Sequence, residues 1–117
     1  MGTWGEGVFE DDMALDAKEL WDAAREKKAS PADATAFVVE KLGSAIPSEG
    51  DVIFFALASL QLDAGVLDDE ISRYVIDAIP ISLEAWRAQG VAEDVYARRV
   101  AALSDLRSRI EDYNKNR

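Results

Sequence analysis

Hydrophobic residues recur every three or four positions along most of the chain, which is the spacing of amphipathic helices. The first such segment begins at Asp11 or Asp12, either of which can cap it. Its acids come early and its bases come late, in the order that a helix dipole favours. We therefore expect a helix from Asp12 to about Lys28, with an apolar face made of Met13, Ala17, Leu20, Trp21 and Ala24.

Two further helices follow from start signals and apolar runs. Ser30 is placed to cap the second helix, and Pro31 is its first residue. Gly43 and Pro47 end this helix. Ser48 caps the next helix, which runs to about Ala64 and is apolar nearly all round. A buried strand is the alternative for its aromatic centre, but its length favours a helix. A helix of this kind is expected in the middle of a bundle.

The second half of the chain predicts three more helical segments. Asp68 is placed to cap a helix that Pro80 ends, because proline lacks the amide that a helix interior requires. Ser82 starts a short piece that Gly90 closes, and a final helix covers roughly 92–113. Opposite charges lie one turn apart in the final helix, and we expect the ion pairs Asp94 with Arg98, Asp105 with Arg109, and Arg107 with Glu111.

No internal repeat interrupts these segments, and no alternating apolar pattern is long enough to build a sheet. We expect an all-α fold: one compact domain over 1–117, built as a bundle of five or six helices. Residues 1–11 form an N-terminal arm packed on the bundle, and residues 114–117 form a frayed tail. With 117 residues, 49% of them hydrophobic, the chain can bury a core of its own.

The formal net charge is −10 and is unevenly distributed. Residues 1–22 carry seven acids and one lysine, residues 47–80 carry seven acids and one arginine, and residues 81–117 are close to neutral. Direct nucleic-acid binding is not expected, because affinity for phosphate needs clustered lysine and arginine. A basic protein would be attracted. The alternative is that the charge serves solubility alone.

Histidine and cysteine are both absent, which excludes several chemistries. Ser-His-Asp and Cys-His catalysis, disulfides and the usual zinc sites each need one of them. The missing cysteines fit a reducing cytoplasm, and the acidic start lacks the basic region of an export signal. The longest apolar run, Val52 to Leu62, has about half the length of a bilayer-spanning helix. We expect a cytoplasmic protein without membrane contact.

Carboxylates are the remaining candidates for a chemical site. Asp12 and Asp16 lie one helical turn apart and Glu19 continues their face, so with an acid from another helix they can hold Mg²⁺ or Mn²⁺ and support phosphoester hydrolysis. Asp51 and Asp63 lie near opposite ends of the apolar helix. Acids early in a helix more often act as caps and dipole partners, and we favour that interpretation. No cofactor is therefore expected.

Aromatic residues and arginines lie together in "SRYV" and "YARRV", around Tyr74, Tyr96, Arg98 and Arg99. An arginine pair beside an aromatic ring can hold a phosphate or a carboxylate. Opposite charges at helical spacing neutralise most of this charge, so we interpret both segments as a solvated face.

The opening, MGTWGEGVFEDDMALD, combines glycines with large aromatic residues. Gly5 and Gly7 permit positive φ and close approach to another surface, and they separate two anchors, Trp4 and Phe9. An arm of this kind can fold back so that both rings lie on the bundle. The alternative is a flexible aromatic arm that recognises a partner. The glycines do not form a phosphate loop, because no strand precedes them and no lysine follows.

A set of spaced residues marks this opening: Met1, Gly2, Trp4, Gly5, Gly7, Phe9, Asp12, Ala14 and Asp16. The set resembles the start of DUF4259, a bacterial family of small proteins of unknown function. The resemblance continues into "SLEAW" at 82–86 and "LSDLRSRI" at 103–110, whereas Val8 and the bulky Phe54 and Phe55 depart from it. The resemblance to this family implies no established activity. We treat Trp4, Gly5, Gly7, Phe9, Asp12 and Asp16 as one structural or binding motif.

These observations favour a non-catalytic protein. We predict an acidic protein-binding module, immunity- or inhibitor-like, whose partner is a basic protein. One alternative is a metal-dependent hydrolase that acts through Asp12, Asp16 and Glu19, and another is a structural homodimer joined through helix faces. Acids gathered on one exposed face would favour the binding module, whereas acids scattered evenly would exclude it.

Overall fold

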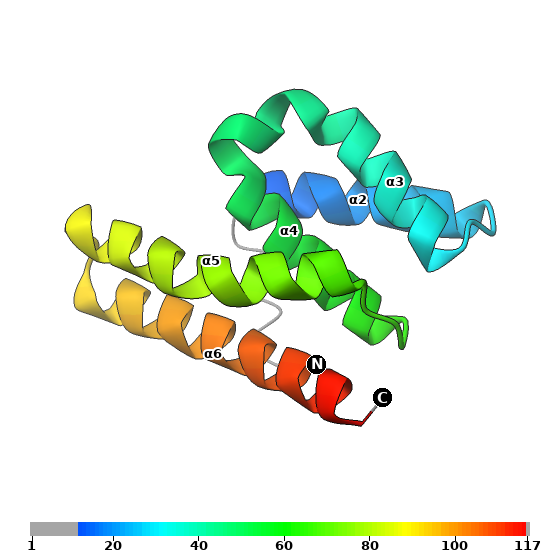
Figure 1. Ribbon diagram of the computed structural model, residues 1–117. Helices are drawn as coiled ribbons and strands as arrows, with labels where there is room; N and C mark the ends of the chain where they lie inside the picture. Colours follow the sequence, from blue (N-terminus) through cyan, green and yellow to red (C-terminus); the bar gives the residue numbers. More distant parts are fainter. Residues whose placement is uncertain (1–11, 117) are drawn as a thin grey trace.

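The computed structural model describes residues 12–116, which form helices with no strand among them (Figure 1). The elements are α2 (Asp12–Glu26), α3 (Pro31–Leu42), the short 3-10 turn η1 (Gly43–Ala45), α4 (Ile46–Asp63), α5 (Asp69–Ala88) and α6 (Glu93–Lys115). The radius of gyration is 13.7 Å, close to the value of about 13 Å for a compact domain of this length. The predicted all-α class is confirmed.

Helix α4 lies between two pairs of helices. Helices α2 and α3 lie side by side on one side of it, and α5 and α6 form an antiparallel pair on the other (Figure 1). The buried hydrophobic side chains form one cluster, to which every one of these helices contributes. Within residues 12–116, no helix combines the length with the apolar character that crossing a bilayer requires.

Helix α4 is buried on nearly every side over most of its length. Phe55 to Gln61 form an unbroken buried run, which Gly50 and Ile53 precede. Because this run is longer than one helical turn, side chains in every direction around the helix axis are buried. The prediction of a helix in the middle of a bundle is confirmed for this segment.

Two of the predicted helix caps are present. The hydroxyl Oγ of Ser30 accepts a hydrogen bond from the backbone amide of Asp33 at 3.1 Å. The carboxylate Oδ1 of Asp68 accepts from the amides of Glu70 at 2.8 Å and Ile71 at 3.3 Å. Each cap satisfies amides that the first turn of a helix leaves without a backbone partner, so α3 and α5 start where the sequence predicts.

The predicted boundary between the second and third helices is wrong in detail. Pro47 lies in the first turn of α4, where its missing N–H removes no helical hydrogen bond, rather than after the end of α3. Ser48 is not the cap of α4, because its hydroxyl donates to the carbonyl of Ala45 at 3.3 Å. Glu49 has non-helical backbone angles (φ −129°, ψ 23°) and kinks α4. The chain therefore turns through η1 and this kink.

Pro80 does not end a helix, because α5 continues through it to Ala88. The ring of Pro80 is exposed, while Ala78 before it and Ser82 after it are buried on the same side of α5. Burial of this side of α5 outweighs the lost backbone hydrogen bond and the clash of the proline ring with the preceding turn, which together cost about 3 kcal/mol in a helix interior. The short helix expected from Ser82 to Gly90 is part of α5, so residues 69–88 form one helix where two segments were expected.

The end of α6 also differs from the prediction. The helix extends to Lys115, so residues 114 and 115 are helical rather than part of a frayed tail. The side-chain amide of Asn114 donates to Ser72 Oγ at 3.0 Å. This hydrogen bond ties the last turn of α6 to the first turns of α5.

Two arginines of α6 form ion pairs that can be compared with the prediction. Arg107 Nε lies 3.2 Å from Glu111 Oε2, as expected for residues one turn apart. Arg109, expected to pair with Asp105, has its Nη2 2.9 Å from Asp63 Oδ1 at the end of α4. An exposed pair of this kind contributes at most about 1 kcal/mol, so it orients α6 on α4 more than it stabilises the fold.

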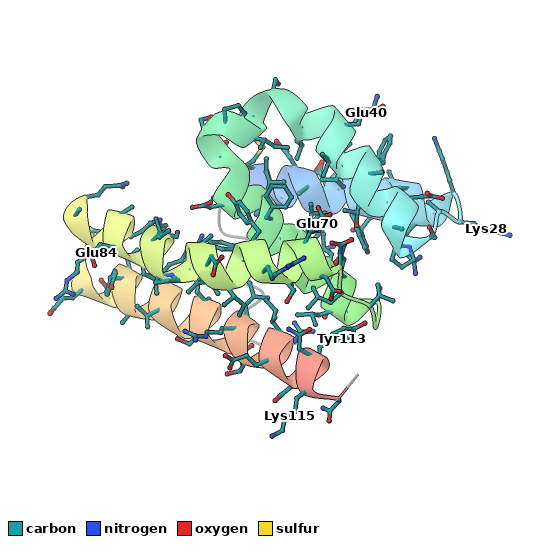
Figure 2. All side chains as sticks on the ribbon, viewed as in Figure 1. Lys28, Glu40, Glu70, Glu84, Tyr113 and Lys115 are labelled. Carbon is teal, nitrogen blue, oxygen red and sulfur yellow. The ribbon has the colours of Figure 1, made fainter. Side chains whose placement is uncertain are left out.

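Three connections between described helices turn at a residue with positive φ: Lys28 (68°), Gly65 (82°) and Gly90 (72°). At Lys28, the amide of Ala29 donates to the carbonyl of Ala24 at 3.1 Å and closes the end of α2. Lys28 lies at the tip of the α2–α3 connection (Figure 2). Lysine has a Cβ, so this left-handed conformation costs it more free energy than it costs glycine.

Replacing Lys28 with glycine is expected to raise the free energy of unfolding by about 1 kcal/mol, because the Cβ clash is removed. Urea unfolding followed by circular dichroism measures the change. Lys27→Gly removes the same charge at the neighbouring position, where φ is not positive, and is expected to destabilise the protein. Equal losses of stability in both variants would contradict the turn geometry.

Candidate functional site

The carboxylates singled out in the sequence lie on the outer side of α2. Asp12, Asp16 and Glu19 are all exposed, opposite the buried alanines and tryptophan of the same helix. Leu15, 42% exposed, lies among them. We call this side the acidic face of α2; it consists of Asp12, Leu15, Asp16, Glu19, Asp22 and Glu26.

Among the described residues, these carboxylates do not form a cluster with acids of another helix. Within residues 12–116, no three His, Cys, Asp or Glu side chains are grouped closely enough to hold a metal ion. A hard cation takes six or more oxygen ligands, most of which must come from the protein or from water. The other two acids considered are engaged elsewhere: Asp51 accepts a hydrogen bond from Tyr74, and Asp63 pairs with Arg109.

The remaining motif residues, Trp4, Gly5, Gly7 and Phe9, lie outside the described residues. Asp12 is the first residue of α2, where an acid interacts favourably with the helix dipole.

A groove of about 350 Å³ lies between α3, α4 and α5, and nothing in the sequence analysis singled it out. Its floor and walls are mostly apolar, and the charged side chains that line it, Asp68 and Glu70, are both acidic. Glu70 lies on the side of α5 that faces α3 (Figure 2). We call it the Tyr74 groove; it is lined by Thr35, Val39, Phe54, Asp68, Glu70, Ile71 and Tyr74.

Tyr74 is held at both ends of its side chain. Its hydroxyl donates to Asp51 Oδ1 at 2.6 Å, and its ring lies against Phe54 with the centroids 4.8 Å apart and the planes tilted by 51°. The hydrogen bond to Asp51, then burial and the charge of Asp51, raise the pKa of Tyr74 from 10.0 to about 12. The phenol therefore stays neutral, and its ring has a fixed place although 42% of the residue is exposed.

A buried amide holds two walls of the groove together. Gln61, only 3% exposed on α4, donates from Nε2 to Thr35 Oγ1 at 2.8 Å. Its Oε1 accepts from the backbone amide of Asp68, also at 2.8 Å. The hydroxyl of Thr35 donates onward to the carbonyl of Pro31 at 2.8 Å. One side chain thus fixes α3 and the start of α5 relative to α4.

Arg99 contradicts the interpretation of "YARRV" as a solvated face. It is only 5% exposed, and its guanidinium carbon lies 5.0 Å from the ring centroid of Trp86 and 5.9 Å from that of Phe55. A spacing signal was available, because Arg99 lies three and four residues before the buried Ala102 and Leu103. The flat guanidinium can be buried against aromatic faces, where the cation–π attraction offsets part of its desolvation.

Comparisons with protein-family models, with curated proteins and with solved structures each found no match to this chain. The resemblance to DUF4259 therefore stays a prediction, and function has to be argued from the side chains described above.

Replacing Gln61 with leucine is expected to lower the free energy of unfolding by about 1–3 kcal/mol, because the amide of Asp68 and the hydroxyl of Thr35 lose a partner. Chemical denaturation measures the loss. Ser59→Ala on the same helix is the control. The Ser59 hydroxyl is fully buried with no hydrogen-bond partner in the structure, so its removal is expected to be neutral or stabilising. Equal losses in the two variants would contradict the role of Gln61.

The Tyr74 hydroxyl is expected to titrate near pH 12, measured as the tyrosinate absorbance of the wild type minus that of Tyr74→Phe. Its folded pKa lies above the ordinary value of 10.0, so the folded state holds the proton more tightly. The resulting stabilisation is complete below about pH 10 and is lost as the pH rises to about 12. Asp51→Asn is expected to bring the titration back toward the ordinary value. A wild-type difference curve centred near 10 would disprove the hydrogen bond.

Proposed function

We propose that this protein is a non-catalytic binding module that presents an acidic surface to a basic protein partner, as an immunity or inhibitor protein does. The observation that supports the proposal most directly is the acidic face of α2. Five carboxylates, those of Asp12, Asp16, Glu19, Asp22 and Glu26, share one exposed side of a helix. Lys18, on the same helix, forms an ion pair with this face, because its Nζ lies 2.8 Å from Asp22 Oδ2.

The distribution of charge over the other helices adds support. Helix α6 carries five acids and five bases, and is balanced. The stretch 46–88, which contains α4 and α5, carries eight acids and two arginines. The excess of acids over bases is therefore uneven, since it lies in α2 and in 46–88 rather than in α6. An even distribution would have argued against a binding module.

Such a surface would act mainly on the encounter between the two proteins. Clustered carboxylates raise the rate of association with a basic partner, and the effect falls as salt screens the charges. Binding that depends on this surface should therefore weaken steeply with ionic strength. A location in the cytoplasm and an arm folded onto the bundle through Trp4 and Phe9 are parts of the same proposal.

The experiment is an affinity capture with the tagged full-length chain from lysate of its host, at low and at high salt. The captured protein is then identified, purified and titrated calorimetrically against three forms of the chain. These are the wild type, an acidic-face variant (Asp16→Asn, Glu19→Gln, Glu26→Gln), and a control that loses three charges elsewhere (Glu84→Gln, Asp105→Asn, Asp112→Asn).

A basic partner is expected that dissociates at high salt and binds the acidic-face variant about tenfold more weakly than the control, since several charge contacts are removed together. Equal affinities for the two variants, or no partner at either salt concentration, would contradict the proposal.

A further inference from the structure

The Tyr74 groove combines an apolar interior with charge of one sign. Val39, Phe54 and Ile71 supply hydrocarbon and aromatic surface, while Asp68 and Glu70 supply carboxylates. None of the described side chains that line it is basic. At about 350 Å³ it is near the lower limit of about 300 Å³ for ligand pockets, so it suits one long side chain better than a helix or a large ligand.

The ring of Tyr74 is prepared to attract a cation. Its hydroxyl donates to the carboxylate of Asp51, which increases the electron density of the ring and strengthens the attraction of its face for positive charge. Contact with Phe54 and the hydrogen bond together fix the ring before anything binds, so little conformational entropy is lost on binding.

Two cations among the described residues already lie over aromatic rings of the same chain. The guanidinium of Arg99 lies over the rings of Trp86 and Phe55, and the ammonium of Lys41 lies 5.5 Å from the ring centroid of Phe37. These contacts use the chain's own cations. The Tyr74 groove offers the same surface, with two carboxylates added, and no cation from residues 12–116 lines it.

We propose that the Tyr74 groove receives an arginine side chain of the basic partner, with the guanidinium between the Tyr74 ring and the Glu70 carboxylate. The methylene groups of that arginine lie along Val39 and Ile71. Arginine suits the groove better than lysine, because its planar group stacks on an aromatic face and bonds a carboxylate at the same time. This inference rests on the proposed function, since it assigns a contact within a complex with a basic protein.

The test is an NMR titration of the full-length, ¹⁵N-labelled protein with N-acetyl-arginine amide, up to the solubility limit of the probe. Uncharged N-acetyl-citrulline amide, which has nearly the same shape, and N-acetyl-lysine amide are titrated in parallel. The arginine probe is expected to shift the backbone amides of Thr35, Val39, Glu70 and Tyr74, and to do so at lower concentration than either of the other two probes.

Three variants connect the shifts to the groove. Tyr74→Leu removes the ring and is expected to weaken binding of the arginine probe about two- to fivefold, whereas Tyr74→Phe keeps the ring and most of the affinity. Glu70→Gln is expected to weaken binding by a similar factor. Glu84→Gln, at the far end of the same helix (Figure 2), is the matched control and should bind as the wild type does. The dispersion of the spectra shows whether each variant is folded.

The outcomes separate this inference from the proposed function. If the basic partner binds but the arginine probe leaves the groove amides unshifted, the groove assignment is wrong and the proposed function stands. If the groove takes the probe but no basic partner exists, the proposed function fails and the groove is no partner contact. Equal responses to the arginine and citrulline probes, or to the arginine and lysine probes, would overturn the assignment to arginine.

Discussion

The packing of residues 12–116 depends on a helix whose second half is buried in every direction. Over the run Phe55–Gln61, α4 buries every residue, so it is stable only where other helices cover it in all directions. The pairs α2–α3 and α5–α6 provide that cover (Figure 1). With neither disulfide nor described metal cluster to hold the helices together, hydrophobic burial around α4 is the main source of stability.

A polar group on such a helix must find its partner inside the protein. Gln61 does so, and through Thr35 and the amide of Asp68 it sets the distance between α3 and the start of α5. The Tyr74 groove opens between these same elements. The groove is therefore bounded by elements that the side chain of Gln61 connects inside the protein.

Local signals in the sequence were sufficient for the fold class and for several helix ends. Ser30 and Asp68 bond amides two or three residues away, so their role depends on neighbours in the chain and could be predicted. Pro80 was misjudged because the packing of α5 outweighs a local preference. Arg99 was misjudged because its burial depends on rings of other helices, Phe55 and Trp86.

The same distinction applies to the two surfaces. The acidic face of α2 follows from residues three and four positions apart on one helix, so the sequence already placed Asp12, Asp16 and Glu19 together. The groove draws its residues from three helices, and Tyr74 meets an acid 23 positions earlier in the chain. No local sequence pattern predicts the contact between Tyr74 and Asp51.

The proline within α5 has a consequence for how the protein opens. Because Pro80 has no amide hydrogen, the carbonyl of Ile76 has no helical donor four residues later. Beyond this point Ser82 is the last buried residue of α5, and the first two residues of α6, Glu93 and Asp94, are exposed. The far end of the α5–α6 hairpin is therefore expected to open at lower free energy than the core, so that its amide hydrogens exchange with solvent before those of α4.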